Sequence, residues 1–174
     1  MSKTKWALDP AHSEIQFKVK HMMIATVTGS FDRFQVEVES DKDDFSDANI
    51  SFSAETASIN TGAEQRDGHL RSADFFDSVK YPEMKFQATS FSPAKNELQG
   101  NLTIKNVTKP VKLEVDFGGI GKDPYGNTKA GFTLTGKINR KDWGLNWNAA
   151  LETGGLLVSE EVRLLGDIQL MKPV

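Results

Sequence analysis

The sequence contains no cysteine among its 174 residues. This absence excludes disulfides, thiolate metal sites and cysteine nucleophiles. Histidine is also scarce: His12, His21 and His69 are the three in the chain, and their positions match neither an H-x-x-x-H nor an H-x-H spacing. Such spacings bring two imidazoles to one metal ion, so we expect no transition-metal site and no cofactor.

Long hydrophobic runs are missing as well. The first residues, Met1–Leu8, lead directly into an Asp-Pro turn and contain no apolar stretch of the length that a signal peptide or a membrane span requires. As given, the chain is therefore expected in the cytoplasm. A chain that begins after a removed leader would look the same, and the expected compartment would then be the periplasm.

Charge of one sign is nowhere concentrated. The 21 basic and 24 acidic residues are interspersed and give a net charge of −3, so the sequence has no basic patch for nucleic acid. No run rich in proline, serine or glycine marks a seam between domains. We therefore expect one domain over residues 1–174 and no nucleic-acid partner.

Apolar and polar residues alternate through most of the chain, which is typical of strands with one buried face. About eight such segments occur, at the spacing of an all-β sandwich or barrel, and short turns between them favour antiparallel pairing. The apolar members of these segments include Ile15, Phe17, Val19, Phe34, Val36, Val38, Ile50, Phe52, Ala54, Met84, Phe86, Leu98, Leu102, Ile104, Val111, Leu113, Val115, Phe117, Phe132, Leu134, Ile138, Val162, Leu164, Ile168 and Leu170.

The alternation slips by one residue in two places, near Lys20-His21 and near Asp32-Arg33. A slip would turn the buried face outward, so a bulge or corner is predicted at each. The glycine cluster Gly118–Gly121 closes a strand and opens no helix, which indicates a strand end or bulge and no phosphate-binding loop.

One segment, Thr61–Asp77, does not alternate. Thr61 and Glu64 have the Thr-x-x-Glu spacing of a capping box, which predicts a helix over residues 62–72. In such a helix Arg66, His69 and Leu70 share one side. The aromatic pair Phe75 and Phe76 that follows is expected to pack as a lid or plug.

A second unusual segment, Arg140–Asn148, places Trp143 and Trp147 around a glycine. It can be a corner in which Arg140 pairs with Asp142 and the indoles seal the end of a barrel. The indoles can equally line the mouth of a cavity, and the two interpretations are compatible.

The chemistry of catalysis has little support in the residues. Ser72, His21 and Asp67 supply the residue types of a hydrolase triad, but no Gly-x-Ser-x-Gly elbow accompanies them. A barrel of about eight strands can be filled by its own side chains or can hold one ligand, and alternation does not separate the two cases.

Several motifs recur in order along the chain, among them Tyr81-Pro-x-Met-x-Phe86 and Asn139-Arg-x-Asp-Trp-Gly-Leu145. The others are Trp6–Phe17, Val27–Phe31, Ala57–Gly62 with Arg66–Asp77, and Gly100–Val111. Together these segments cover nearly the whole chain and closely resemble the YceI-like family.

The resemblance implies an eight-stranded antiparallel lipocalin-like barrel with a short helical insert, whose interior binds a long amphiphile. The implied cargo is a polyisoprenoid, an isoprenoid quinone or a fatty-acid amide, which the protein would transport or store. The family carries no defined catalytic set, so no catalytic residue is expected. A homodimer is a further implication; a membrane partner is not identified. Many family members are periplasmic or secreted, whereas this sequence shows no leader.

Under this hypothesis the ligand-binding residues fall into three groups. The tunnel would be lined by Ile15, Phe17, Val19, Phe52, Phe86, Leu102, Phe132 and Leu134, and its rim by Phe75, Phe76, Trp143 and Trp147. Arg66, with His69 and His21, would meet the polar headgroup. The alternatives are an enzyme that acts on such a lipid with His21 or His69 as base, and a structural protein with a self-filled barrel.

Overall fold

The computed structural model describes residues 3–149, 151 and 157–173. In this part of the chain eleven strands form one antiparallel sheet, accompanied by the helix α1 (Glu64–Arg71). The strands are β1 (Lys5–Leu8), β2 (Glu14–His21), β3 (Ala25–Phe31), β4 (Phe34–Glu39), β5 (Asn49–Glu55), β6 (Ile59–Asn60), β7 (Glu83–Ser92), β8 (Glu97–Ile104), β9 (Val107–Lys122), β10 (Thr128–Asn139) and β11 (Glu161–Met171). Short 3-10 turns are η1 (Pro10–His12), η2 (Thr56–Ser58), η3 (Pro93–Lys95) and η4 (Arg140–Trp143).

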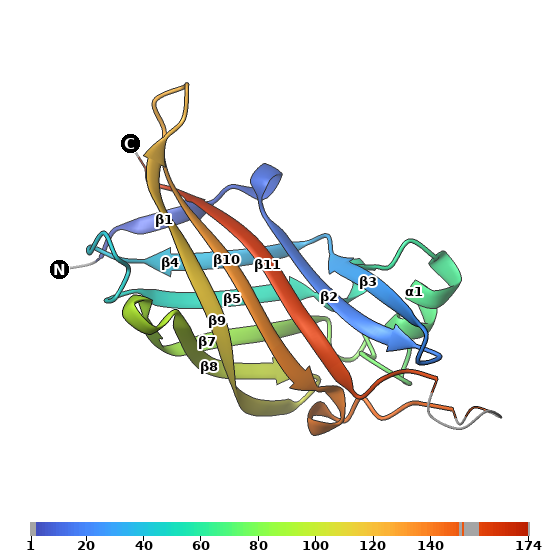
Figure 1. The fold of residues 1–174 in the computed structure, drawn as a ribbon. Coiled ribbons are helices and arrows are strands. Elements are labelled where there is room, and N and C mark those ends of the chain that lie inside the picture. Colours follow the sequence, from blue (N-terminus) through green and yellow to red (C-terminus); the bar gives the residue numbers. More distant parts are fainter. Residues whose placement is uncertain (1–2, 150, 152–156, 174) are drawn as a thin grey trace.

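Eight of the strands close on themselves in the order β1-β4-β5-β7-β8-β9-β10-β11, and β11 returns to β1 through Leu170 and Met171. The predicted eight-stranded antiparallel barrel with a helical insert is thereby confirmed. In Figure 1 the two termini lie at one end of the barrel and α1 lies at the other.

The strand β2 continues from β1 after the turn η1 and pairs with the first half of β11, from Lys18 opposite Arg163 to Glu14 opposite Asp167. On its other side β2 pairs with β3, and β3 pairs with the two-residue strand β6. Beside β11, the wall at the end near α1 is therefore formed by β2 and β3. At the other end the corresponding part of the wall is formed by β1 and β4.

Both predicted corners occur. The chain reverses directly after Lys20-His21, between β2 and β3, and breaks at Asp32-Arg33, between β3 and β4. The prediction for the glycine cluster is also confirmed: Phe117 pairs with Phe132 and Gly119 pairs with Gly131, which leaves Gly118 as the extra residue of a bulge.

The helix is shorter than predicted. It spans Glu64–Arg71, Ala63 is its N-cap, and no side chain caps it. Thr61 does not form the predicted capping box because its hydroxyl donates to Asp67 Oδ1 at 2.5 Å, and Glu64 instead pairs with Arg71.

The end of the barrel near the termini is solid. Phe45, 1% exposed, projects from the loop between β4 and β5 and meets the rings of Trp6, Phe117 and Phe132 at centroid distances of 5.1, 5.4 and 5.1 Å. Asp47 organises this loop by accepting hydrogen bonds from Ser40 Oγ at 2.6 Å and from the Asp41 amide at 3.0 Å. These donors, the Ser40 hydroxyl first, lower the pKa of Asp47 to about 2.

We predict that Phe45→Ala destabilises the fold by about 3–5 kcal/mol, because removal of a fully buried ring loses its transfer free energy and leaves a void. Urea unfolding measures the change. Tyr125→Ala is the control, since Tyr125 is 87% exposed and its removal should alter stability by less than about 0.5 kcal/mol. Equal effects of the two substitutions would show that Phe45 does not anchor this end.

Candidate functional site: an apolar cavity in the barrel

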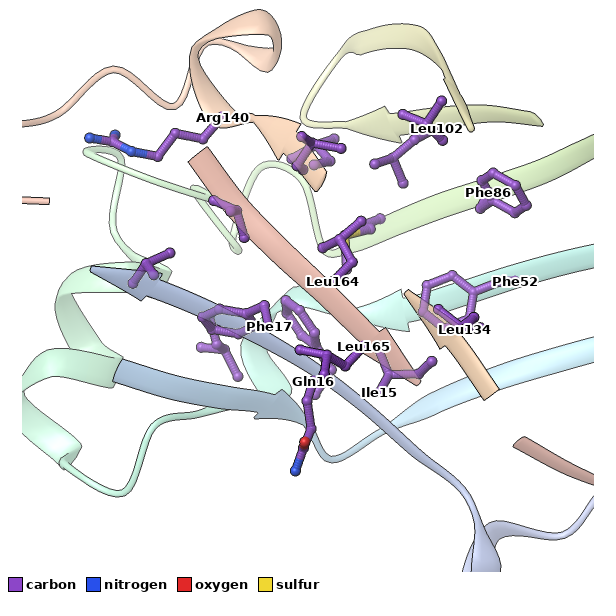
Figure 2. A pocket seen from close by; sticks show the side chains of 18 of the residues that line it. Ile15, Gln16, Phe17, Phe52, Phe86, Leu102, Leu134, Arg140, Leu164 and Leu165 are labelled. Carbon is purple, nitrogen blue, oxygen red and sulfur yellow. The ribbon is translucent and has the colours of Figure 1, made fainter. Parts of the chain in front are cut away.

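The remainder of the barrel interior is hollow. A cavity of about 760 Å³ extends from Phe45 at the solid end to α1 at the other, and its walls are almost wholly apolar. Figure 2 shows Phe17 of β2, Phe52 of β5 and Leu134 of β10 around this space. The volume lies within the roughly 300–1,000 Å³ that is usual for small-molecule sites.

Two glycines explain how large rings and an open interior coexist. A Cβ atom at Gly29 would lie 2.2 Å from Cζ of Phe17, and one at Gly100 would lie 2.4 Å from Cζ of Phe86. Each ring therefore fills the space beside a glycine of the neighbouring strand that a larger side chain would occupy. The rings cover the wall and leave the centre of the barrel empty.

All of the predicted ligand-binding residues except Trp143 line this cavity. The wall contains Ile15, Phe17, Val19, Phe52, Phe86, Leu102, Phe132 and Leu134. The end beside α1, which we call the mouth, contains His21, Arg66, His69, Phe75, Phe76 and Trp147. Their placement agrees with the hypothesis, while their role in binding stays a prediction.

The placement of Trp143 at the rim is wrong. Its side chain is buried and its Nε1 donates to the carbonyl oxygen of Leu102 at 2.9 Å, so the indole fixes the turn η4 to β8. The mouth is lined by Trp147 alone of these two tryptophans.

The predicted pair between Arg140 and Asp142 is also wrong. The Arg140 guanidinium is buried and donates to four backbone carbonyls: Nε to Ser159 at 2.9 Å, Nη1 to Leu145 at 2.5 Å and to Trp147 at 2.9 Å, and Nη2 to Val158 at 3.3 Å. Burial lowers the pKa of Arg140, and the charge of nearby Glu160 opposes that shift. Arg140 thus holds the segment that carries Trp147 against the start of β11.

Aromatic contacts join this segment to the helical insert. The imidazole of His69 stands edge-on to Trp147 at 4.6 Å and to Phe75 at 5.2 Å, and its Nε2 lies 2.8 Å from Asp74 Oδ2. Phe76 contacts Phe31 of β3 with centroids 5.7 Å apart. The predicted lid role of Phe75 and Phe76 fits these contacts, because they connect α1 to both sides of the mouth.

Arg66 is exposed at the same end and is held by the residue that was expected to cap the helix. Its Nε donates to Thr61 Oγ1 and its Nη2 to the Thr61 carbonyl oxygen, both at 2.7 Å. The buried carboxylate of Asp67 accepts from the amide and hydroxyl of Thr61. These hydrogen bonds fix the Arg66 guanidinium at the rim of the cavity.

The three residues of the possible triad do not form one. Ser72 Oγ donates to the carbonyl oxygen of His69, and the carboxylate of Asp67 is occupied by Thr61. His21 forms a backbone bridge with Val158 at the cavity wall. Among residues 3–149, 151 and 157–173, no cluster of three His, Cys, Asp or Glu side chains could hold a metal ion. In the same residues no helix has the length and apolar character to cross a membrane.

The sequence reasoning missed several wall residues. Leu164 belongs to the alternating final strand and could have been included on that basis, as could Ile138 of β10. Leu157 and Val158 carry no such signal, because they precede β11 in a segment without alternation.

Comparison with known proteins gives a consistent result. Residues 6–170 match the YceI-like domain. A UPF0312 protein of Staphylococcus aureus strain N315 is 41% identical over 161 residues, which cover 92% of this chain and 93% of that protein.

Solved structures share the fold. BcnA of Burkholderia cenocepacia superposes with a TM-score of 0.79 at 22% identity, covering 93% of this chain and 98% of BcnA. The Campylobacter jejuni YCEI protein gives 0.75 at 30% identity over 89% of this chain and 90% of that one. A polyisoprenoid binding domain from Saccharophagus degradans gives 0.66 at 16% identity, over 97% and 98% of the two chains. With its barrel, its cavity and its sequence in agreement, the chain belongs to the YceI-like family.

Proposed function

We propose that the protein binds one long amphiphilic lipid in its barrel and carries or stores it without chemical conversion. The observation that carries the proposal is the apolar cavity of about 760 Å³. Packed aromatic rings close one end of this cavity, and polar groups border the other end. An occupant that matches this shape has a long apolar tail and a small polar end.

Burial of the tail supplies the affinity. Each methylene transferred from water contributes about 0.8 kcal/mol, so a tail of about 20 carbons offsets the loss of translational and conformational freedom with few polar contacts. Selection by chain length is consequently loose. An isoprenoid, an isoprenoid quinone and a fatty-acid amide all satisfy this description, and the structural neighbour from Saccharophagus degradans is described as a polyisoprenoid binding domain.

We expect the polar end of the lipid at the mouth, near Arg66, His69 and His21, and the proposal is supported by the position of these three residues along the cavity. Arg66 offers a charge-assisted hydrogen bond to a phosphate or carbonyl oxygen. An enzyme that uses one of the two histidines as a base is the competing function, and it is separated from a carrier by experiment.

We predict that protein purified without detergent retains a bound mass on the order of several hundred daltons in native mass spectrometry. The His21→Ala/His69→Ala variant should retain the same unmodified cargo, because a carrier needs no proton transfer. A protein that shows no bound mass, even after incubation with a C20 isoprenoid alcohol, contradicts lipid binding. Conversion of that alcohol by the natural protein and not by the variant supports the enzyme.

We predict that Gly29→Ala weakens binding of a fluorescent C20 isoprenoid by at least about tenfold. The new methyl group must push the Phe17 ring off the wall and into the cavity, where it displaces several methylenes of the tail. Gly131→Ala is the matched control, since a Cβ atom there meets nothing within 4 Å. Unchanged affinity in Gly29→Ala would place the lipid elsewhere.

We predict that Arg66→Ala lowers affinity for an isoprenyl phosphate about tenfold and leaves affinity for the neutral alcohol unchanged, because only the phosphate gains a charge-assisted hydrogen bond. Arg71→Ala is the control on the same helix, since Arg71 pairs with Glu64 and does not border the cavity. If Arg66→Ala binds both the phosphate and the alcohol as tightly as the natural protein does, Arg66 takes no part in headgroup recognition.

A further inference from the structure

The turn between β2 and β3 presents three consecutive apolar side chains to solvent. Met22, Met23 and Ile24 are 45, 66 and 82% exposed. The turn lies at the mouth, because the adjoining His21 and Val27 line the cavity and the Met22 amide donates to the carbonyl oxygen of Leu157. In Figure 1 the tip of this hairpin lies at the same end of the barrel as α1.

The backbone of this turn is unfavourable for its residues. Met22 and Met23 have φ of 54° and 61°, and the Ile24 amide donates to the His21 carbonyl oxygen at 3.2 Å, which is the pattern of a type I′ turn. Such turns favour Asn-Gly, because residues with long side chains rarely adopt the left-handed conformation. Two methionines here improve neither the turn nor the core, so their exposure suits a contact outside the chain.

A row of basic side chains crosses the outer wall near this turn. Register places Lys137 of β10 opposite Arg163 of β11, and Arg163 opposite Lys18 of β2, so the three side chains share one face. None of the three lines the cavity, hence that face is the outer one. Like charges directly opposite each other weaken a sheet. Glu161, 4.0 Å from Lys137, offsets only part of this row.

The same face becomes acidic farther from the mouth. Asp167 of β11 lies opposite Glu14 of β2 and opposite Thr133 of β10, and Thr133 lies opposite Asp116 of β9. The two rows are separated by four residues, about 13 Å along the strands. Between Glu14 and Asp32 the β2–β3 hairpin carries Lys18, Lys20 and His21 and no acidic residue, in a chain of net charge −3.

We propose that the Met22–Ile24 turn and the basic row formed by Lys137, Arg163 and Lys18 are a docking surface for an anionic phospholipid bilayer. The apolar tip enters the interface, the basic row faces the headgroups, and the acidic row keeps the far end away. The mouth is then turned toward the membrane from which a lipid is taken or to which it is delivered. The purpose of this docking rests on the proposed lipid-binding function; the docking itself needs no cargo.

The test is co-flotation of cargo-free protein with vesicles of equal parts phosphatidylcholine and phosphatidylglycerol. Met22→Asn/Met23→Gly should raise the dissociation constant at least about tenfold, because it removes apolar contacts while it supplies the residues that a type I′ turn favours. Its melting temperature should not fall, which separates lost docking from lost folding. Lys18→Gln/Arg163→Gln should weaken binding about tenfold at low salt and little at high salt.

Matched controls lie at the other end of the barrel. Tyr125→Asn removes one exposed apolar side chain, and Lys5→Gln/Lys122→Gln removes two exposed basic ones; both should bind vesicles as the natural protein does. Equal binding by the natural protein and both mouth variants overturns the proposal, as does absence of binding. Concentration-dependent dimerisation that Met22→Asn/Met23→Gly abolishes, without vesicle binding, assigns the turn to a second copy and also overturns it.

A second measurement separates this inference from the proposed function. Uptake of a fluorescent C20 isoprenoid is followed from an ethanol dispersion and from the same vesicles. Docking predicts that Met22→Asn/Met23→Gly slows uptake from vesicles only. If the natural protein takes up lipid from neither source yet still binds vesicles, the lipid-binding function fails and the docking surface stands.

Discussion

The pairing of β11 with two different strands is the constraint on which the rest of this structure depends. Its last residues pair with β1 and its first half pairs with β2, so one strand closes the barrel along its whole length. The turn η1 separates β1 from β2. On the side away from β11, β1 pairs with β4 and β2 pairs with β3. The wall is closed at the end that contains β1, because β1 pairs with both β11 and β4. At the other end, among the described residues, β3 pairs with β2 and the short β6, and Phe76 of the insert packs against Phe31 of β3.

The same side-chain type fills one end of the barrel and leaves the other hollow. Phe45 enters the interior from the loop between β4 and β5 and meets three rings. Phe17 and Phe86 project from strands and lie over Gly29 and Gly100 of the neighbouring strands. The volume of the cavity therefore depends on pairs of positions far apart in sequence, and the number of aromatic residues does not determine it.

This dependence explains what the sequence could predict. Alternation with a period of two predicts which side chains face inward, because that property follows from the backbone of each strand alone. All eight residues predicted for the tunnel wall line the cavity for this reason. The choice between a filled and a hollow barrel could not be made, because it requires the register that brings Gly29 beside Phe17.

The wrong predictions share a cause. Thr61 and Arg140 were assigned partners three and two residues away by motif spacing, whereas Thr61 binds Asp67 and Arg140 binds the carbonyls of Leu145, Trp147, Val158 and Ser159. Trp143 was assigned to the rim, whereas it binds Leu102 of a neighbouring strand. A buried donor seeks an acceptor wherever one is left without a ladder partner, and irregular segments have many such carbonyls. A fixed motif spacing is consequently a poor guide in such irregular segments, where regular strands end.

The two ends of the barrel also differ in the contacts that must break before a ligand can pass through the wall. Around the closed end, neighbouring strands are joined by backbone hydrogen bonds, which number from two residue pairs for β1 upward, and the cost of separation rises with each pair. At the mouth, the helical insert meets the Trp147 segment through the contacts of His69 and Phe75 with one indole. In the part of the chain that the structure describes, no strand pairing joins the two. Side-chain contacts of this kind can part and re-form locally while the ladders stay intact. Passage of a long tail is therefore least costly beside α1, at the end that also carries the exposed β2–β3 turn.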